Sequence, residues 1–221
     1  MSSDVPALYR VAIEKIRRSS DPKIERLRKS IALGDIRGVD AEPLAIADFA
    51  GEAENWGAAA FSELRSTGFI CASVANFAWY RPSVAELTDD LAVLAGIEST
   101  AIIRLSALNC TGALAEISAR LEDLRQAAAT KSSITFLLAH QKLMLAVVAS
   151  SNEEQLFKEF AGRATVATVY ARAAYDGTMD FAKVYGAAEA MVNLLCAPGS
   201  RQCAALAADM RLQSPITLAA A

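Results

Sequence analysis

The sequence predicts an all-α protein, and three features of its composition and spacing carry that prediction. Of the 221 residues, 46 are Ala, whereas only 6 are Pro and 11 are Gly. Alanine loses no side-chain entropy in a helix, and the two residues that interrupt helices are scarce. No proline occurs between Pro82 and Pro198, so nothing in that span breaks a helix by the proline mechanism. Because apolar residues also recur at helical spacing, we expect a single helical core of roughly ten helices, with an arm at each end.

The N-terminal part of the chain contains clear helix signals. Asp21 and Pro22 fit the N-cap and first position of a helix, and Gly34 stands where that helix is expected to end. Ser83 and Glu86 have the spacing of a capping box, in which each side chain bonds the backbone of the other residue. Apolar residues spaced by three and four positions follow this box, and they predict a second clear helix.

Later helices are predicted from the same signals. The helix that opens at Ser83 is expected to end at Gly96. After Thr111 the apolar spacing repeats, and Ser151 with Glu154 gives a second capping-box pattern before another apolar run. Two further helices are expected to begin at Thr178 and at Ser200.

Evidence for strands is thin. The runs Ala101–Leu105 and Thr165–Tyr170 are rich in β-branched residues, which favour strands. Both runs lie inside Ala-rich stretches with uninterrupted helical patterns, so we assign them to helices. No strand is therefore predicted anywhere in the chain.

Charge divides the chain into regions, although the net charge is only −3. Residues 1–40 hold nine Lys/Arg and six Asp/Glu, residues 41–100 hold two and nine, and residues 101–221 hold eleven and ten. A strongly basic nucleic-acid-binding domain is not indicated. The acidic stretch is either a solvated face or a docking surface for the basic arm of a neighbouring subunit. We expect a charged N-terminal arm (1–40), an all-α core domain (41–211) and an apolar C-terminal tail (212–221).

Residues typical of catalysis or metal binding are scarce. His140 is the only histidine, the four cysteines form no CxxC pair, and no phosphate-binding glycine motif occurs. We therefore expect no enzyme activity, no catalytic residue, no metal site and no cofactor. The start of the chain does not resemble a secretion signal, so a reducing compartment is expected. The most apolar stretch, Ile134–Ala149, is too short and too polar to predict a membrane span.

One segment has a familiar order of residues. Between residues 133 and 177 an Ile-Thr start, an Ala/Val-rich helix end, a glycine and an aromatic-Asp-Gly close follow one another. These are Ile134–Thr135, Ala146–Val148, Gly162, Ala173–Tyr175 and Asp176–Gly177. In this order the segment resembles the core of coat proteins from flexible filamentous, potexvirus-like plant RNA viruses. The resemblance implies a helical capsid subunit that assembles along RNA.

The arms and the resemblance lead to one functional hypothesis. A helical core with an arm at each end suits a subunit that packs head-to-tail as a homo-oligomer in a filament. The partners would be further copies of the chain and single-stranded RNA, with no membrane and no metal, in a virion or in the host cytoplasm. The alternative is a cytoplasmic α-helical scaffold or regulatory protein that binds a partner protein without RNA.

The candidate RNA contacts are basic residues near or within the segment that carries the resemblance. Lys131, Lys142, Arg163 and Arg172 are expected to hold RNA phosphates without reading bases, because nearby acids do not match all of them. Asp176 is expected to be the structural partner of Arg172, which stands four residues earlier on the same predicted helix.

Overall fold

The computed structural model describes residues 21–36, 38–73, 76–107, 111–174 and 180–195, without the side chains of 106–107, 111–112, 133–134 and 171–174. Within these ranges the chain forms eight helices and one two-stranded sheet. The predicted helical class is therefore right for most of the described chain, but the sheet was not predicted. Ten helices are not found in these ranges. The tail 212–221 and residues 1–20 of the arm lie outside them.

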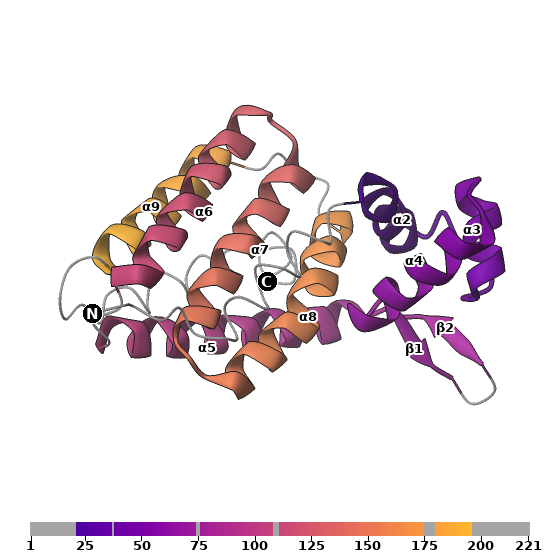
Figure 1. The fold of residues 1–221 in the computed structure, drawn as a ribbon, viewed down its shortest axis with the longest axis horizontal. Coiled ribbons are helices and arrows are strands. Elements are labelled where there is room, and N and C mark those ends of the chain that lie inside the picture. Colours follow the sequence, from indigo (N-terminus) through magenta and orange to yellow (C-terminus); the bar gives the residue numbers. More distant parts are fainter. Residues whose placement is uncertain (1–20, 37, 74–75, 108–110, 175–179, 196–221) are drawn as a thin grey trace.

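The first part of the chain folds into a small body, which we call the N-terminal unit (residues 21–80, right in Figure 1). Its elements are α2 (Pro22–Leu33), α3 (Pro43–Ala50), α4 (Glu54–Ser66), β1 (Ile70–Ala72) and β2 (Phe77–Trp79). The two strands pair antiparallel, with Cys71 opposite Ala78. Leu64 of α4 and Phe69, just before β1, are fully buried.

The rest of the described chain forms a helical bundle (left in Figure 1). Its helices are α5 (Val84–Ala107), α6 (Thr111–Ala129), α7 (Ser133–Ser150), α8 (Glu154–Ala174) and α9 (Phe181–Leu195). Helix α7 packs against α5, α6 and α8, and α6 also packs against α9. Every residue of α7 from Leu143 to Ser150 is buried, as expected for a helix that neighbours surround.

Two of the predicted helix boundaries are confirmed by their hydrogen bonds. The Asp21 carboxylate accepts a bond of 2.8 Å from the Lys23 N–H, and Gly34 ends α2 in the left-handed conformation with φ of 81°. The Ser83 N–H donates to the Glu86 carboxylate at 2.7 Å, and the Glu86 N–H donates to the Ser83 hydroxyl at 3.2 Å. This pair is the predicted capping box at the start of α5.

Two other boundary predictions are wrong. Helix α5 continues through Gly96 to Ala107, because the neighbouring Leu94 and Ile97 are buried in the core. Their packing outweighs the cost of about 1 kcal/mol for a glycine inside a helix. Ser151 forms no capping box and instead ends α7, where its hydroxyl donates to the Val148 carbonyl at 2.7 Å.

The sheet was missed because its strands are very short. Each has three residues, too few for the alternation of apolar and polar residues that identifies a strand in a sequence. The runs Ala101–Leu105 and Thr165–Tyr170, by contrast, are helical as predicted and lie within α5 and α8.

The N-terminal unit and the bundle are in direct contact. Helix α2 packs against α8, and the ring of Phe69 stacks on that of Tyr170 with centroids 6.1 Å apart. The Tyr170 hydroxyl donates to the Tyr80 carbonyl. Burial raises the pKa of the Tyr170 hydroxyl to about 12, so it keeps its proton and remains a donor. These contacts fix the N-terminal unit against one side of the bundle.

Candidate nucleic-acid interface

Helices α3 and α4 are joined by a tight turn of three residues, 51–53. Gly51 begins this turn with φ of 66°, in the left-handed region that glycine adopts without strain. The Glu52 N–H donates back to the Ala47 carbonyl at 2.9 Å, which closes the C-terminus of α3. Two helices joined by a three- or four-residue turn that contains glycine form a helix-turn-helix motif.

The two helices of this motif touch at a glycine. A Cβ atom on Gly57 of α4 would lie 2.2 Å from the Pro43 carbonyl oxygen and 2.7 Å from the Cβ of Ala47. Both atoms belong to α3, so only a residue without a side chain allows this approach. Gly57 therefore sets the distance and the angle between the helices.

Helix α4 presents one side to its own core and the other to solvent. Ala60 and Leu64 are fully buried, and Gly57 is buried between the helices. The exposed residues of α4 form what we call its outer face: Glu54, Asn55, Ala58, Ala59, Ser62, Arg65 and Ser66. In DNA-binding proteins with this motif, the second helix enters the major groove and its N-terminal residues contact the bases. The outer face of α4 is in the corresponding position.

The hairpin is held beside α4 by aromatic contacts. The rings of Phe61 and Phe77 meet edge to face with centroids 5.1 Å apart. The guanidinium of Arg65 lies 4.9 Å from the centroid of the Phe77 ring, within the range of a cation–π contact. The Trp79 indole N–H donates to the Val39 carbonyl at 2.8 Å. These contacts hold the hairpin in a fixed position beside α4.

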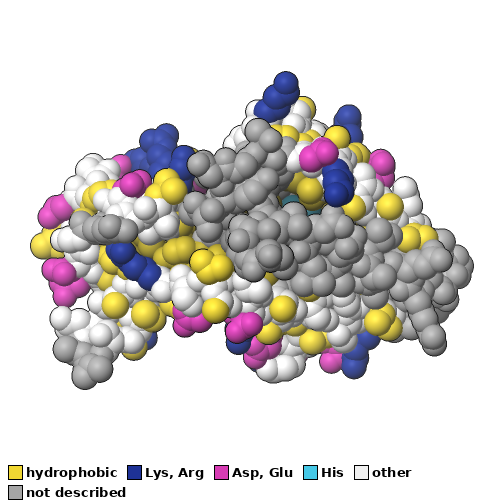
Figure 2. All heavy atoms as spheres, turned by 180° about the vertical axis from the view of Figure 1, so that it is seen from behind, with side chains coloured by type: hydrophobic (Ala, Val, Ile, Leu, Met, Phe, Trp, Pro, Cys, Tyr) yellow, Lys and Arg dark blue, Asp and Glu magenta, His cyan; other side chains and the backbone are white. Residues whose placement is uncertain are grey.

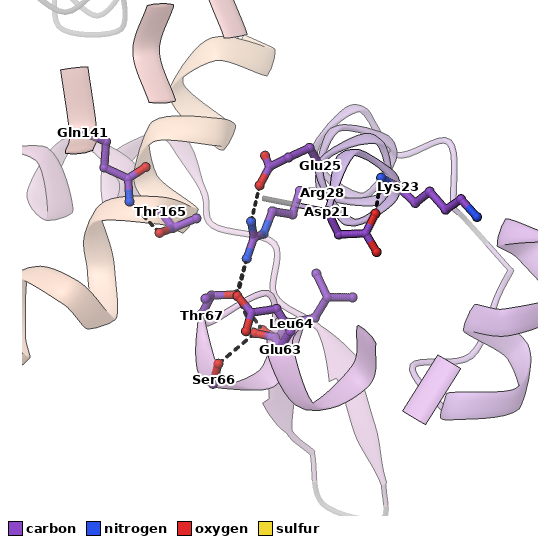
Figure 3. A network of polar contacts seen from close by, with 10 residues as sticks. All are labelled: Asp21, Lys23, Glu25, Arg28, Glu63, Leu64, Ser66, Thr67, Gln141 and Thr165. Atoms are coloured by element: carbon purple, nitrogen blue, oxygen red, sulfur yellow. Dashed lines mark hydrogen bonds and ion pairs between the residues drawn. The ribbon is translucent and has the colours of Figure 1, made fainter. Parts of the chain in front are cut away.

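A buried arginine joins α2 to α4 (Figure 3). Arg28 is only 2% exposed, and it pairs with Glu25 on its own helix and with Glu63 on α4 at 2.9 Å. It also donates to the Thr67 hydroxyl at 3.4 Å and lies 5.6 Å from the centroid of the Phe69 ring. A charge this deeply buried is tolerated only when it is paired and hydrogen-bonded, so the network fixes how α2 meets α4.

The start of α2 is tied to the helix-turn-helix motif as well. The indole N–H of Trp56 on α4 donates to the Asp21 carboxylate at 3.1 Å, and Lys23 pairs with Glu52 in the turn. The pKa of the Asp21 carboxyl is lowered, chiefly by its bond from the Lys23 N–H and next by its bond from Trp56. Asp21 therefore stays ionised and accepts both bonds near neutral pH.

The charge on the helix-turn-helix motif is unusual for a surface that meets nucleic acid. Between residues 40 and 64 there is no Lys, Arg or His, whereas six residues are acidic: Asp40, Glu42, Asp48, Glu52, Glu54 and Glu63. Acidic side chains accordingly line the outer edge of this end in the space-filling view (left in Figure 2). The exposed basic residues around it are Lys23, Arg26 and Lys29 on α2, Arg65 in the last turn of α4, and Arg81 after the hairpin.

The basic residues predicted to hold RNA belong to the bundle and lie outside this motif. Arg163 on α8 pairs with Asp90 of α5 at 2.6 Å and with Glu159 at 3.5 Å. Its hydrogen bond to Asp90 raises the pKa of the Arg163 guanidinium, and desolvation partly opposes this rise. Arg163 is therefore engaged in linking two helices of the bundle.

No hydrogen bond or ion pair between described residues joins the other predicted site residues to Arg163. Lys131 is exposed in the turn between α6 and α7, and Lys142 is half-buried on α7. Arg172 belongs to α8, but its side chain is not described, and Asp176 lies outside the described residues. Their role in binding a polyanion stays a prediction.

The bundle contains little that suggests chemistry in the described part. His140 is buried on α7, as expected for a structural histidine. Among the described residues no three His, Cys, Asp or Glu side chains are grouped so that they could hold a metal ion. None of the helices in these ranges is long and apolar enough to span a membrane.

Three solved structures share this fold over most of their length. E. coli McbR/YncC aligns with a TM-score of 0.64 at 17% sequence identity, over 90% of this chain and 95% of its own. A protein described as a transcriptional regulator GntR from Rhodococcus sp. RHA1 aligns with a TM-score of 0.57 at 15% identity, over 93% and 95%. Lar, described as controlling expression of the Listeria monocytogenes agr system, aligns with a TM-score of 0.51 at 13% identity, over 87% and 94%. No protein-family model and no curated protein matches the sequence.

These similarities correct the functional hypothesis drawn from the sequence. The fold is that of the three proteins above, so the resemblance to filamentous-virus coat proteins was wrong. The same finding contradicts the capsid function, the head-to-tail filament, single-stranded RNA as a partner and the location in a virion. Common residue types in two Ala-rich helical sequences produced the likeness. Two of the similar proteins are described as regulators of gene expression.

The helix-turn-helix motif was not recognised in the sequence, although signals for it are present. Pro43 precedes a short apolar helix, Gly51 follows it, and a second helical stretch ends before Gly68. These signals were weak because α3 has only eight residues and α4 has no side-chain N-cap. The acidic composition of residues 41–100 also argued against a nucleic-acid-binding domain in this part of the chain.

Proposed function

We propose that the chain is a transcriptional regulator that binds duplex DNA through the outer face of α4, with the hairpin and α2 beside it. One observation carries the proposal: a helix-turn-helix motif with an exposed second helix stands at one end of a chain whose fold is shared with described regulators. In the proposed complex α4 lies in the major groove and α3 crosses above it.

The distribution of charges predicts how the binding of DNA should depend on salt. Arg26, Lys29, Arg65 and Arg81 are exposed around the motif and are the candidates for phosphate contacts. The motif itself offers no cation between residues 40 and 64, so few phosphates are neutralised. Because each neutralised phosphate contributes about −0.9 to the slope of log K against log salt, we expect a shallow salt dependence. Non-specific binding should accordingly be weak.

The helical bundle supports the N-terminal unit through α2, α8 and the contact between Phe69 and Tyr170.

We also expect two copies to act together, because regulators with this motif bind paired half-sites as dimers. This two-copy arrangement is closed, unlike the filament first considered.

The test compares two identical substitutions of exposed helical alanines. Ala58→Glu adds a bulky charge to the outer face of α4, and Ala92→Glu adds the same group to the exposed side of α5. Binding is followed by fluorescence anisotropy with a pool of random duplexes about two helical turns long, at low salt. We expect Ala58→Glu to abolish binding and Ala92→Glu to leave it unchanged. Equal binding by both variants would place the DNA contact elsewhere.

A second function is favoured by the acidity of the motif. The exposed Leu44 and Phe49 of α3 flank Asp48, a combination of apolar and acidic groups that suits a basic protein segment better than a phosphate backbone. The chain would then be a regulatory protein that acts through a partner protein.

One substitution separates the two functions. Asp48→Asn removes a negative charge from the exposed side of α3. If the motif binds DNA, the affinity for the duplex pool rises because repulsion of phosphates falls. If the motif binds protein, the duplex pool stays unbound by both the native chain and the variant.

A further inference from the structure

The outer face of α4 carries a specific set of base-contacting groups, and we infer that it reads A·T base pairs, with Asn55 as the residue that selects adenine. This inference rests on the proposed function, since the binding site is the helix-turn-helix motif itself. It goes further by naming the bases that the site recognises.

The residues that would face the bases lie along one line of the helix. Asn55, Ala59, Ser62 and Ser66 are separated by four, three and four positions, so they share one side of α4, and Ala58 lies beside them. All five are exposed. Small side chains let the helix backbone approach the floor of the groove closely. Alanine methyl groups at that depth contact the methyl group of thymine, which marks an A·T pair in the major groove.

Asn55 is the one amide on this face, and it is near the N-terminus of α4. A side-chain amide matches adenine with two hydrogen bonds, one donated to N7 and one accepted from N6. The Asn55 Oδ1 accepts a bond of 2.9 Å from the Trp56 N–H. An amide oxygen has two lone pairs, so Oδ1 keeps one acceptor site for adenine N6, and both N–H groups remain donors. The bond to Trp56 also restricts the side chain before DNA arrives.

Groups that select guanine are missing from the N-terminal part of the face. Guanine is read by Arg or Lys, and between residues 54 and 64 the helix contains neither. Arg65 is close to the end of α4, and its guanidinium lies over the Phe77 ring of the hairpin. We therefore assign Arg65 to the phosphate backbone or the hairpin side, where it makes no base contact.

Besides Arg65, Glu54 is the group on the exposed side that could favour a G·C pair, since a carboxylate accepts from cytosine N4. It precedes Asn55 and therefore projects about 100° around the helix from it. Glu54 lies at the edge of the outer face, next to the acidic turn at Glu52. In this position its carboxylate faces the phosphates at the side of the groove. It lowers the affinity for DNA by repulsion and contacts no base.

Selection from random duplexes tests the inference on the full-length chain. Bound duplexes are recovered and sequenced over several rounds, and the enriched half-site is compared between the native chain and three variants. We expect A·T pairs at every position enriched by α4. Asn55→Ala should lower the preference for one adenine by about 5- to 150-fold. Asn55→Arg should change the preference at that position from adenine to guanine.

The control is Asn193→Ala, which removes the same amide from an exposed position on α9. It should leave the selected sequence unchanged. Enrichment of G·C pairs by the native chain, or an adenine preference that survives Asn55→Ala, would overturn the inference while the DNA-binding function stands. Failure of the native chain to bind or enrich any duplex would instead reject the proposed function, and the inference with it.

Discussion

Replacement of Gly57 by Ala should loosen the helix-turn-helix motif. The added methyl group would lie 2.2 Å from the Pro43 carbonyl oxygen, 2.7 Å from the Ala47 Cβ and 3.2 Å from the Ala47 nitrogen. Two of these atoms belong to the backbone of α3 and cannot turn aside, so the helices must separate by about 1 Å, an overpacking that costs about 1–3 kcal/mol. Alanine regains about 1 kcal/mol of helix propensity. We therefore expect a net loss of about 0–2 kcal/mol in the free energy of unfolding.

The control is the same substitution at Gly96, where an added Cβ meets no atom within 4 Å. Gly96→Ala should stabilise the protein by about 0.5–1 kcal/mol, since nothing opposes the gain in helix propensity. Urea unfolding is followed by tryptophan fluorescence, because Trp56 and Trp79, the only two tryptophans, both lie in the N-terminal unit. Stabilisation by Gly57→Ala equal to that by Gly96→Ala would refute the close contact between α3 and α4.

Three further results are expected. Arg28→Met should lower the free energy of unfolding by about 1–3 kcal/mol in urea titrations, because Glu25 and Glu63, which are 21% and 26% exposed, lose their bonds from the guanidinium; a loss below about 0.5 kcal/mol would show that the network contributes little. Tyr170→Phe should cost about 1 kcal/mol at neutral pH through loss of the bond to Tyr80. The folded pKa of Tyr170, about 12, exceeds the ordinary value of 10.0, so the stability from this group is complete below pH 10 and is lost as the pH rises toward 12. The variant should therefore lose less stability than the native chain over that interval, and parallel pH curves would contradict this. Reductant should leave the melting temperature unchanged, since Cys71 is a free thiol and the other three cysteines, which lie outside the described residues, are predicted to be reduced; a drop of several degrees would reveal a disulfide.

Local signals in the sequence predicted much of the helical structure. The N-cap at Asp21, the glycine at the end of α2 and the capping box at Ser83 depend on neighbouring residues only, and each is found as predicted. Predictions that ignored packing were wrong. Gly96 does not end a helix, because the residues around it are buried. Whether a glycine ends a helix depends on packing contacts with residues distant in sequence.

These local signals did not predict the candidate site. Its outer face consists mainly of Ala, Ser and one Asn, residue types that carry no catalytic or phosphate-binding pattern. Only the placement of α4 over α3, set by Gly57, and of the hairpin next to Phe61 makes these residues a surface. The bonds of Arg28 to Glu63 and Thr67 join residues more than thirty positions apart, so the sequence did not indicate this network.

The central claim is that α4 lies against duplex DNA, and site-specific photo-cross-linking tests it most directly. A photoreactive side chain is placed at Ser66, at the end of the outer face, or at Asn193, an exposed residue of α9. Each protein is irradiated with the duplex pool at low salt. The account predicts covalent protein–DNA complexes from the Ser66 position and none from the Asn193 position. Equal cross-linking from both positions, or cross-linking from Asn193 alone, would contradict it.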